Sequence, residues 1–268
     1  MKITATIVAF NEERNIARVI RSLGLGMAQG VGSGAVPLVV PDLTQCCADE
    51  VLVIDSGSSD RTREIAVSMG ARVVEEPWRG YAAQKNFAAS LAANDWILSL
   101  DADEELTSEL AAEIAALKSR PPDFDAWTMP RRARYLGRWI RHSGWYPDRK
   151  VRLYHRERAE WVGEYVHESV QVKGAVGHLN DDLLHYTCDS LSQHLQTLNR
   201  YTSLAAQAVV ASGKAVPMRR LLLDPPWTFF RSYVIQRGFL DGMQGFLIAA
   251  MASFYTFMKY AKAREPRA

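Results

Sequence analysis

Short apolar runs alternate with stretches of helical periodicity over the first 120 residues. The run 51–54 is continuously apolar, which is typical of a strand that is covered on both faces. The expected strands are 3–10, 51–54, 72–75 and 96–100, and the expected helices are 12–23, 60–69, 81–93 and 104–118. Strands that alternate with helices in this way predict an α/β fold with a mostly parallel sheet.

The pattern changes after Pro121-Pro122. Residues 123–186 carry short aromatic and basic runs without helical periodicity, which indicates mixed strands and loops. Residues 190–212 are periodic again and predict a helix. The tail 221–263 is apolar and aromatic but is interrupted by Pro225-Pro226, Asp241 and Gln244. We therefore expect three parts, with boundaries near residues 120 and 188.

The composition and the cysteines exclude several classes of protein. Hydrophobic residues make up 48% and charged residues 23%, which is ordinary globular usage and excludes collagen, coiled coil and general disorder. Cys46, Cys47 and Cys188 form no even set and no CxxC pair, so we expect inert thiols without disulfides or zinc. Polar residues 11–14 follow the first apolar run where a cleavage site would need small residues. We therefore expect no signal peptide and a reducing, cytoplasmic location.

The net charge of +2 is unevenly distributed. Residues 131–158 contain ten Arg or Lys against two acidic residues, interleaved with Tyr and Trp. Such a stretch suits a nucleic acid, because cations meet phosphates and aromatic rings stack on bases. A phosphate-bearing glycolipid at a membrane surface suits it equally, and a solvated salt-bridged surface is the third interpretation.

Three of the expected strands end in polar clusters. These are Asn11-Glu12, residues 55–60 and residues 101–104. In open parallel sheets, ligands bind outside the carboxyl ends of the strands. The sequence therefore predicts a binding site at that edge.

Each cluster has a chemical and a structural interpretation. Asp101 and Asp103 can share a divalent cation, or they can cap the helix expected at 104–118. Asp55 can accept hydrogen bonds from a base or a ribose, or it can belong to a turn followed by a helix cap. Lys85 can face a phosphate together with a helix N-terminus, or it can be a solvated surface lysine.

The joint order of four stretches resembles the inverting family 2 glycosyltransferases of the GT-A fold. The stretches are TIVAFNEERNI, VLVIDSGSSDRT, GYAAQKNFAAS and WILSLDADEEL. Further stretches resemble one branch, the lipopolysaccharide core glucosyltransferases of the WaaE/KdtX type: GWYPDRKVRLYHR, WVGEYVHESV, LLHYT and RGFLDGMQGFLIAAMASFYTFMKYAK. The glycine-rich segment 24–48 is longer than the usual link at that place.

The resemblance implies a role for each strand-end residue. Asn11 and Glu12 are expected to line the nucleotide pocket, beside Asp55 on the uracil or ribose. Lys85 is expected near the diphosphate. Asp101 is expected to face ribose and metal, with Asp103 as the main ligand of Mg²⁺ or Mn²⁺. Residues 1–120 are then the nucleotide-sugar-binding half of the GT-A domain, 121–188 its acceptor half, and 189–268 a helical extension that associates with a membrane surface.

Inverting transfer needs a base for the proton of the acceptor hydroxyl. The resemblance places this group at Val166-His167-Glu168, and Glu168 is our candidate. His167 could instead be the base or complete the metal shell. Glu104 is a second candidate base, and a salt-bridged strand carboxylate is the alternative for Glu168. In the basic stretch, Arg149, Arg152 and Trp145 are expected to meet the anionic acceptor.

Residues 245–258 of the tail carry no charge. This stretch is shorter than the roughly 20 residues that span a bilayer. Its aromatic residues, followed by Lys259, Lys262, Arg264 and Arg267, favour a helix that lies at an anionic membrane surface. A buried core helix or an oligomer interface is the alternative.

The resemblance and the residues together predict a metal-assisted enzyme that transfers a hexose, with UDP-glucose as the expected donor. The expected acceptor is a heptose of the lipopolysaccharide inner core, at the cytoplasmic face of the inner membrane. The alternatives are a family 2 enzyme with another acceptor, such as a lipid phosphate or a protein, and a membrane-docked nucleotide-sugar-binding protein without turnover. No nucleic-acid partner is expected, because nucleic-acid binding leaves the strand-end carboxylates unexplained.

Overall fold

The computed structural model describes residues 1–24, 46–163, 168–213 and 215–265. Its strands are β1 (Ile3–Ala9), β2 (Glu50–Asp55), β3 (Arg72–Glu75), β4 (Trp96–Asp101), β5 (Glu104–Leu106), β6 (Ala126–Tyr135), β7 (Arg138–Trp139), β8 (Asp148–His155), β9 (Ala159–Val162), β10 (Ser169–Val172), β11 (Val176–His178) and β12 (Leu183–Cys188). Its helices are α1 (Ile16–Ser22), α2 (Thr62–Ser68), α3 (Tyr81–Leu91), α4 (Ser108–Lys118), α5 (Leu191–Ala211), α6 (Met218–Phe230), η2 (Arg231–Ile235), η3 (Gly238–Asp241) and α7 (Gly242–Ala263).

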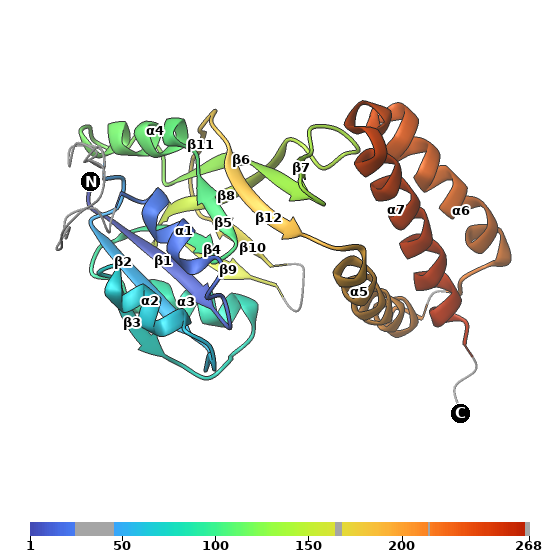
Figure 1. The fold of residues 1–268 in the computed structure, drawn as a ribbon, viewed down its shortest axis with the longest axis horizontal. Coiled ribbons are helices and arrows are strands. Elements are labelled where there is room, and N and C mark those ends of the chain that lie inside the picture. The colour runs from blue at the N-terminus through green and yellow to red at the C-terminus, as the bar shows by residue number, and fades with distance from the viewer. Residues whose placement is uncertain (25–45, 164–167, 214, 266–268) are drawn as a thin grey trace, which may run out of the picture. The chain divides into compact units, whose positions relative to one another are not determined.

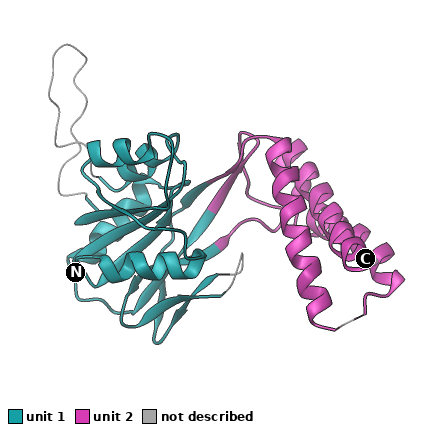
Figure 2. Cartoon of the chain, turned by 90° about the horizontal axis from the view of Figure 1, so that it is seen from below, with its two compact units in different colours: residues 1–131, 149–185 teal, residues 132–148, 186–268 magenta. Residues whose placement is uncertain are grey.

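The chain divides into two compact units. Unit 1 comprises residues 1–131 and 149–185, and unit 2 comprises residues 132–148 and 186–268 (Figure 2). The long hairpin segment 132–148 therefore belongs with the C-terminal helices, although it lies in the middle of the sequence.

A parallel sheet with the order β3-β2-β1-β4 is the centre of unit 1 (Figure 1). Alternate residues of its strands pack into hydrophobic clusters on opposite faces of the sheet, because successive side chains of a strand point to opposite faces. Ile7 and Val53 pack in one cluster with residues of α1, α2 and α4. Leu52 and Ile54 pack in another with Ala88 of α3. This two-sided burial explains the continuous apolar runs and confirms the predicted α/β class.

The rest of the main sheet is mixed. β8 pairs antiparallel with β4, and β5 pairs antiparallel with β12. β5 corrects one expectation, because residues 104–106 were predicted to begin a helix. The helix α4 starts only at Ser108, after Thr107 caps it by accepting a hydrogen bond from the backbone N–H of Leu110 at 3.2 Å.

Unit 2 is built around α7, against which α5 and α6 pack. The predicted helix near 190–212 is confirmed as α5, and Ser190 caps it by accepting a hydrogen bond from the backbone N–H of Gln193. α6 runs through Pro225 and Pro226, where the sequence indicates an interruption. Contacts with α7 hold this segment: the hydroxyl of Ser253 donates to the carbonyl of Pro225 at 2.8 Å.

The cysteines are free thiols, as expected. Cys47 is fully buried, and burial raises the pKa of its thiol to about 12, which makes it inert near neutral pH.

Candidate active site

The polar strand ends meet at one edge of the parallel sheet. In the register of β1 with its two neighbours, Ala9 lies opposite Asp55 of β2 and Val8 lies opposite Asp101 of β4. Asn11 follows directly after β1. The predicted convergence of these clusters at the carboxyl ends of the strands is therefore confirmed.

Asp55 organises the turn that follows β2. Its buried carboxylate accepts hydrogen bonds from the backbone N–H groups of Gly57 at 3.0 Å and Ser58 at 2.8 Å. Gly57 has a φ of 90°, which suits glycine in a tight turn. Asn11 joins the same turn, since its side-chain oxygen accepts a hydrogen bond from the backbone N–H of Ser59. The two loops are thus held together, and contact of Asn11 and Asp55 with a nucleotide stays a prediction.

Asp101 is held by two cations from distant parts of unit 1. Its Oδ1 lies 2.7 Å from Nζ of Lys85 on α3, and its Oδ2 lies 2.7 Å from Nη2 of Arg152 on β8. Lys85 is buried, which excludes a solvated surface lysine. Asp101 also ends a strand that is followed by β5 rather than by a helix, so it does not cap a helix.

Glu104 completes this buried network. Its Oε1 lies 2.6 Å from Nη2 of Arg152 and 3.5 Å from Nη1 of Arg131, and its Oε2 accepts a hydrogen bond from the backbone N–H of Asp101. The Glu104 side chain is 0% exposed. This placement gives Glu104 a positioning role and favours Glu168 over it as a base that must reach an acceptor.

The network favours the ionised form of Asp101. Burial alone would raise the pKa of Asp101, but the cations of Arg152 and Lys85 outweigh it and hold the pKa far below its ordinary value. Burial alone would lower the pKa of Arg152, but Asp101 and Glu104 outweigh it and the pKa is raised. With Arg131 included, three cations face two carboxylates. Lys85, Arg131 and Arg152 supply positive charge that suits an anionic ligand such as a diphosphate, and the carboxylates of Asp103 and Glu12 lie close by.

Trp161 of β9 supports the cations, and sequence analysis did not single it out. The Nζ of Lys85 lies 4.1 Å from the centre of the Trp161 ring, close enough for a cation–π contact. The side chain of Asn86 exchanges two hydrogen bonds with the backbone of Trp161. The sequence feature that could have pointed to Trp161 is its place in a β-rich run, together with the adjacent polar residues Lys85 and Asn86 on α3.

Asp103 pairs with a histidine that the sequence analysis also missed. Its Oδ2 lies 3.3 Å from Nε2 of His185 on β12. Burial raises the pKa of Glu12, an effect opposed by a hydrogen bond from Asn15 and reinforced by the carboxylate of Asp103. Glu12 therefore lies near the Asp103–His185 pair. The motif LLHYT carries His185, but nothing local in it indicates the partner.

The donor chemistry of Asp103 and His185 fits a divalent cation. A carboxylate oxygen and an imidazole nitrogen are both ligands of Mn²⁺, and Mg²⁺ prefers oxygen and keeps substrate phosphates in its shell. Both oxygens of Asp101 are occupied by Lys85 and Arg152. In the described parts of the chain, no group of three or more His, Cys, Asp or Glu side chains is placed to hold a metal ion. A cation here would need oxygen atoms of the substrate to complete its coordination.

Glu168 lies immediately before β10 and is half-buried. Its Oε2 is buried and accepts no hydrogen bond from the residues that the structure describes. A buried oxygen without a hydrogen bond is unfavourable in free energy unless a ligand or a proton reaches it. This favours a chemical role for Glu168 over the alternative that it is a salt-bridged strand carboxylate. His167 lies outside the described residues.

The three residues of the expected acceptor patch lie in different local surroundings. Arg152 is 3% exposed and belongs to the ion network, so its assignment to an exposed patch is corrected. Arg149 is exposed, and its guanidinium donates to the carbonyl of Leu179 at 2.9 Å. Trp145 packs edge-on against Tyr135 within unit 2. Arg149, Arg152 and Trp145 are close in the sequence, but each has different neighbours in the fold.

Comparison with known proteins decides the family. The model of the family described as Glycosyl transferase family 2 matches residues 4–179. The chain belongs to glycosyl transferase family 2. A protein from Rickettsia felis described as an uncharacterized glycosyltransferase is 34% identical to it, over 98% of this chain and 90% of that protein. The lipopolysaccharide core biosynthesis glycosyltransferase LpsC of Rhizobium meliloti is 28% identical, over 100% of this chain and 94% of LpsC.

The similar solved structures are more distant in sequence from this family 2 member. S. aureus TarS 1–349 in complex with UDP-GlcNAc is 15% identical, with a TM-score of 0.48 over 93% of this chain and 79% of that chain. Glucosyl-3-phosphoglycerate synthase from Mycobacterium tuberculosis, in complex with Mn²⁺, UDP and glucosyl-3-phosphoglycerate, is 17% identical, with a TM-score of 0.45 over 80% of this chain and 81% of that chain.

Proposed function

We propose that this family 2 glycosyltransferase inverts the anomeric carbon while it transfers a hexose from a UDP-sugar, with UDP-glucose as the expected donor. The observation that carries the proposal is the cation-rich network around Asp101, next to the Asp103–His185 pair, at the carboxyl ends of β1, β2 and β4. Residues 1–120 act as the donor half, and residues 121–188 act as the acceptor half.

The chain's own residues orient the donor and accept one proton. The loops held by Asn11 and Asp55 bind the nucleoside, while Lys85 and Arg152 keep Asp101 in one orientation. Asp103 and His185 would hold Mg²⁺ or Mn²⁺, and the ion would supply positive charge for the departing diphosphate. The acceptor oxygen attacks the anomeric carbon of the donor sugar. The bond between that carbon and the diphosphate oxygen breaks, and UDP leaves with the electron pair. Glu168 takes the acceptor proton.

The proposed acceptor is a heptose of the lipopolysaccharide inner core. The relationship to LpsC, whose name places it in lipopolysaccharide core biosynthesis, supports this class of acceptor. The exposed Arg149 supports an anionic acceptor, since core oligosaccharides carry phosphate.

Transfer should require the acceptor, a divalent cation and the Glu168 carboxylate. We expect Glu168→Gln to retain UDP-glucose binding and to lose transfer by about 10²–10⁴-fold, because the amide cannot take a proton. The measurement compares UDP-, GDP- and ADP-hexoses with a heptose-terminated core oligosaccharide, with Mg²⁺, Mn²⁺ or EDTA.

Glu160→Gln is the matched control, since Glu160 is an exposed glutamate on the neighbouring strand β9 and should keep full activity. Near wild-type turnover of Glu168→Gln would refute the assignment of Glu168 as the base. Loss of transfer in His167→Gln but not in Glu168→Gln would assign the base to His167. Failure of every UDP-sugar to bind with metal present would refute the donor proposal.

We propose further that the enzyme docks on the cytoplasmic face of the inner membrane. None of the helices in the described ranges is both long and apolar enough to cross a bilayer. α7 is in part a core helix, because Ile248 and Ala249 are buried and the ammonium of Lys262 donates to α5. The exposed apolar surface is greater on the segment before it, which we call the α6–η3 face: Met218, Leu222, Leu223, Trp227, Phe230, Val234, Ile235, Phe239 and Leu240.

Charge complementarity favours an anionic membrane as the occupant of the α6–η3 face. Its exposed cations are Arg219, Arg220, Arg231 and Arg237. Of its two acidic residues, Asp224 is half-exposed and accepts a hydrogen bond from the hydroxyl of Tyr260, and Asp241 is buried. Apolar and aromatic residues flanked by Arg are typical of surfaces that insert at the interface of anionic lipids.

Charge reversal on this face should weaken membrane binding. We expect Arg231→Glu with Arg237→Glu to reduce co-sedimentation with phosphatidylglycerol vesicles by at least about tenfold at low salt, since each such cation contributes about 1 kcal/mol. Arg120→Glu with Lys173→Glu makes the same charge change at exposed sites of unit 1 and should leave binding unchanged. Equal binding by the two double variants would refute the α6–η3 face.

A further inference from the structure

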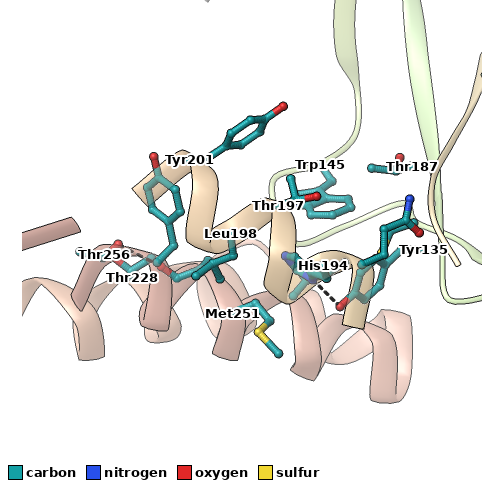
Figure 3. A pocket seen from close by; sticks show the side chains of 15 residues that line it. Tyr135, Trp145, Thr187, His194, Thr197, Leu198, Tyr201, Thr228, Met251 and Thr256 are labelled. Carbon is teal, nitrogen blue, oxygen red and sulfur yellow. Dashed lines mark hydrogen bonds between the residues drawn. The ribbon is translucent and has the colours of Figure 1, made fainter. Parts of the chain in front are cut away.

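Unit 2 contains a pocket that the transfer reaction does not use. It has a volume of about 420 Å³ and lies between α5 and α7, beside Tyr135 and Trp145. This volume falls within the range of about 300–1,000 Å³ that is usual for small-molecule sites. Figure 3 shows the hydrogen bond between Tyr135 and His194 beside the side chains of Leu198 and Met251.

The pocket wall carries no formal charge. Among the described residues that line it, none is Asp, Glu, Lys or Arg. Burial raises the pKa of Tyr135 to about 12, and burial lowers the pKa of His194 below its ordinary value. Both groups are therefore neutral at pH 7 and offer no ion pair to a phosphate or a carboxylate.

Key polar groups of the wall are already paired within the protein. The hydroxyl of Tyr135 and Nδ1 of His194 are 2.8 Å apart. The hydroxyl of Thr228 donates to the carbonyl of Asp224, and that of Thr256 donates to the carbonyl of Ala252. A sugar or a phosphate that entered would lose hydrogen bonds to water, and these groups could replace them only by giving up their own bonds, which is unfavourable.

We propose that this pocket binds one hydrocarbon chain of a lipid. Leu198, Ile248, Met251 and Ala252 supply an apolar wall, and removal of apolar chain from water is favourable by about 25 cal/mol per Å². The same unit carries the apolar and basic α6–η3 face, which would bring it to a lipid surface. The proposal is independent of the donor sugar and of turnover.

Fluorescence of cis-parinarate, a polyene fatty acid that brightens in apolar surroundings, tests the proposal on the full-length protein without donor or metal. We expect saturable binding of one parinarate per chain. Ala252→Leu reduces the space, and Met251→Glu places a negative charge, of the same sign as the carboxylate of parinarate, in the apolar wall. Each should weaken parinarate binding by at least about tenfold, because burial of an unpaired charge or a clash in a filled site is unfavourable.

The matched controls carry the same substitutions outside the pocket. Ala208→Leu changes an exposed position of α5, and Met243→Glu changes an exposed position of α7; neither residue lines the pocket. Both should bind parinarate like the wild type. Circular dichroism of all four variants confirms that each is folded, and the two pocket variants are independent of each other.

Competition identifies the source of the chain. Displacement of parinarate by laurate and by lysophosphatidylcholine assigns the pocket to an acyl chain of a membrane lipid, and displacement by laurate alone assigns it to a free fatty acid. The proposal is overturned if parinarate does not bind saturably, if the folded pocket variants bind like their controls, or if heptose or glucose displaces the probe and laurate does not. None of these measurements uses transfer activity. A failure of the proposed lipid binding is therefore distinguishable from a failure of the proposed donor.

Discussion

Replacement of Asp103 by Asn is expected to reduce hexose transfer by at least about 10³-fold. The variant keeps the size of the side chain but removes the charge that would hold a divalent cation beside His185. A bound cation contributes several kcal/mol to stabilisation of a departing phosphate, and each 1.4 kcal/mol is tenfold in rate. The measurement is UDP release with a core acceptor, as a function of Mn²⁺ and Mg²⁺ concentration.

Asp123→Asn serves as the control for the loss of one carboxylate. Asp123 is exposed, at 64% for its side chain, and lies outside the strand-end clusters, so its variant should transfer like the wild type. The metal titration separates two causes of lost activity: a weakened cation site needs more metal, whereas general damage to the fold does not respond to metal. Full activity of Asp103→Asn at low metal would refute the metal assignment.

Replacement of Arg152 by Met is expected to lower the free energy of unfolding by about 3–5 kcal/mol. The guanidinium is 4% exposed and pairs with Asp101 and with the fully buried Glu104. Its removal leaves a buried carboxylate without its closest cation, which is strongly destabilising. Chemical denaturation at pH 7 measures the change, and Arg158→Met, whose side chain is 64% exposed, should shift stability by less than about 1 kcal/mol.

The pH dependence of stability supplies an internal check. Asp101 has a lower pKa in the folded protein than its ordinary value of 3.8, so its contribution is fully present above pH 3.8 and is lost as the pH falls further. Arg152→Met should weaken this dependence. Addition of Glu104→Gln to Arg152→Met should restore part of the stability, since it removes the uncompensated charge. A stability loss equal to that of Arg158→Met would contradict the proposed role of the network.

Much of the sheet edge that carries the strand-end clusters follows from local sequence. The continuous apolar run at 51–54 is typical of a strand covered on both faces, and the alternation of strands with helices predicts that its polar end lies at the carboxyl edge of a parallel sheet. The same argument places Asp101 after β4. Because the carboxyl ends of neighbouring parallel strands share an edge, the meeting of Asn11, Asp55 and Asp101 was predictable without coordinates.

Local sequence failed where a pattern has two outcomes of similar energy. The acidic residues at 103–105, followed by an alanine-rich stretch, suit the first turn of a helix, yet β12 takes residues 104–106 as a strand partner and Thr107 caps α4. Likewise, the run 131–158 predicts one basic surface. Its Arg152 instead points into the core, because β8 lies between β4 and β6 and alternate side chains of a strand face opposite sides.

The sequence by itself determined the α/β class, the strand-end clusters, and an apolar tail too short to span a bilayer. Only the tertiary structure decided that Asp101 pairs with Arg152, 51 residues away, that Asp103 pairs with His185, and that residues 132–148 belong with the C-terminal helices to frame a pocket. The physical reason is the range of the forces involved. Periodicity and turn chemistry act over a few residues, whereas ion pairs and cavities are set by which strands become neighbours, and that choice depends on the energy of the whole fold.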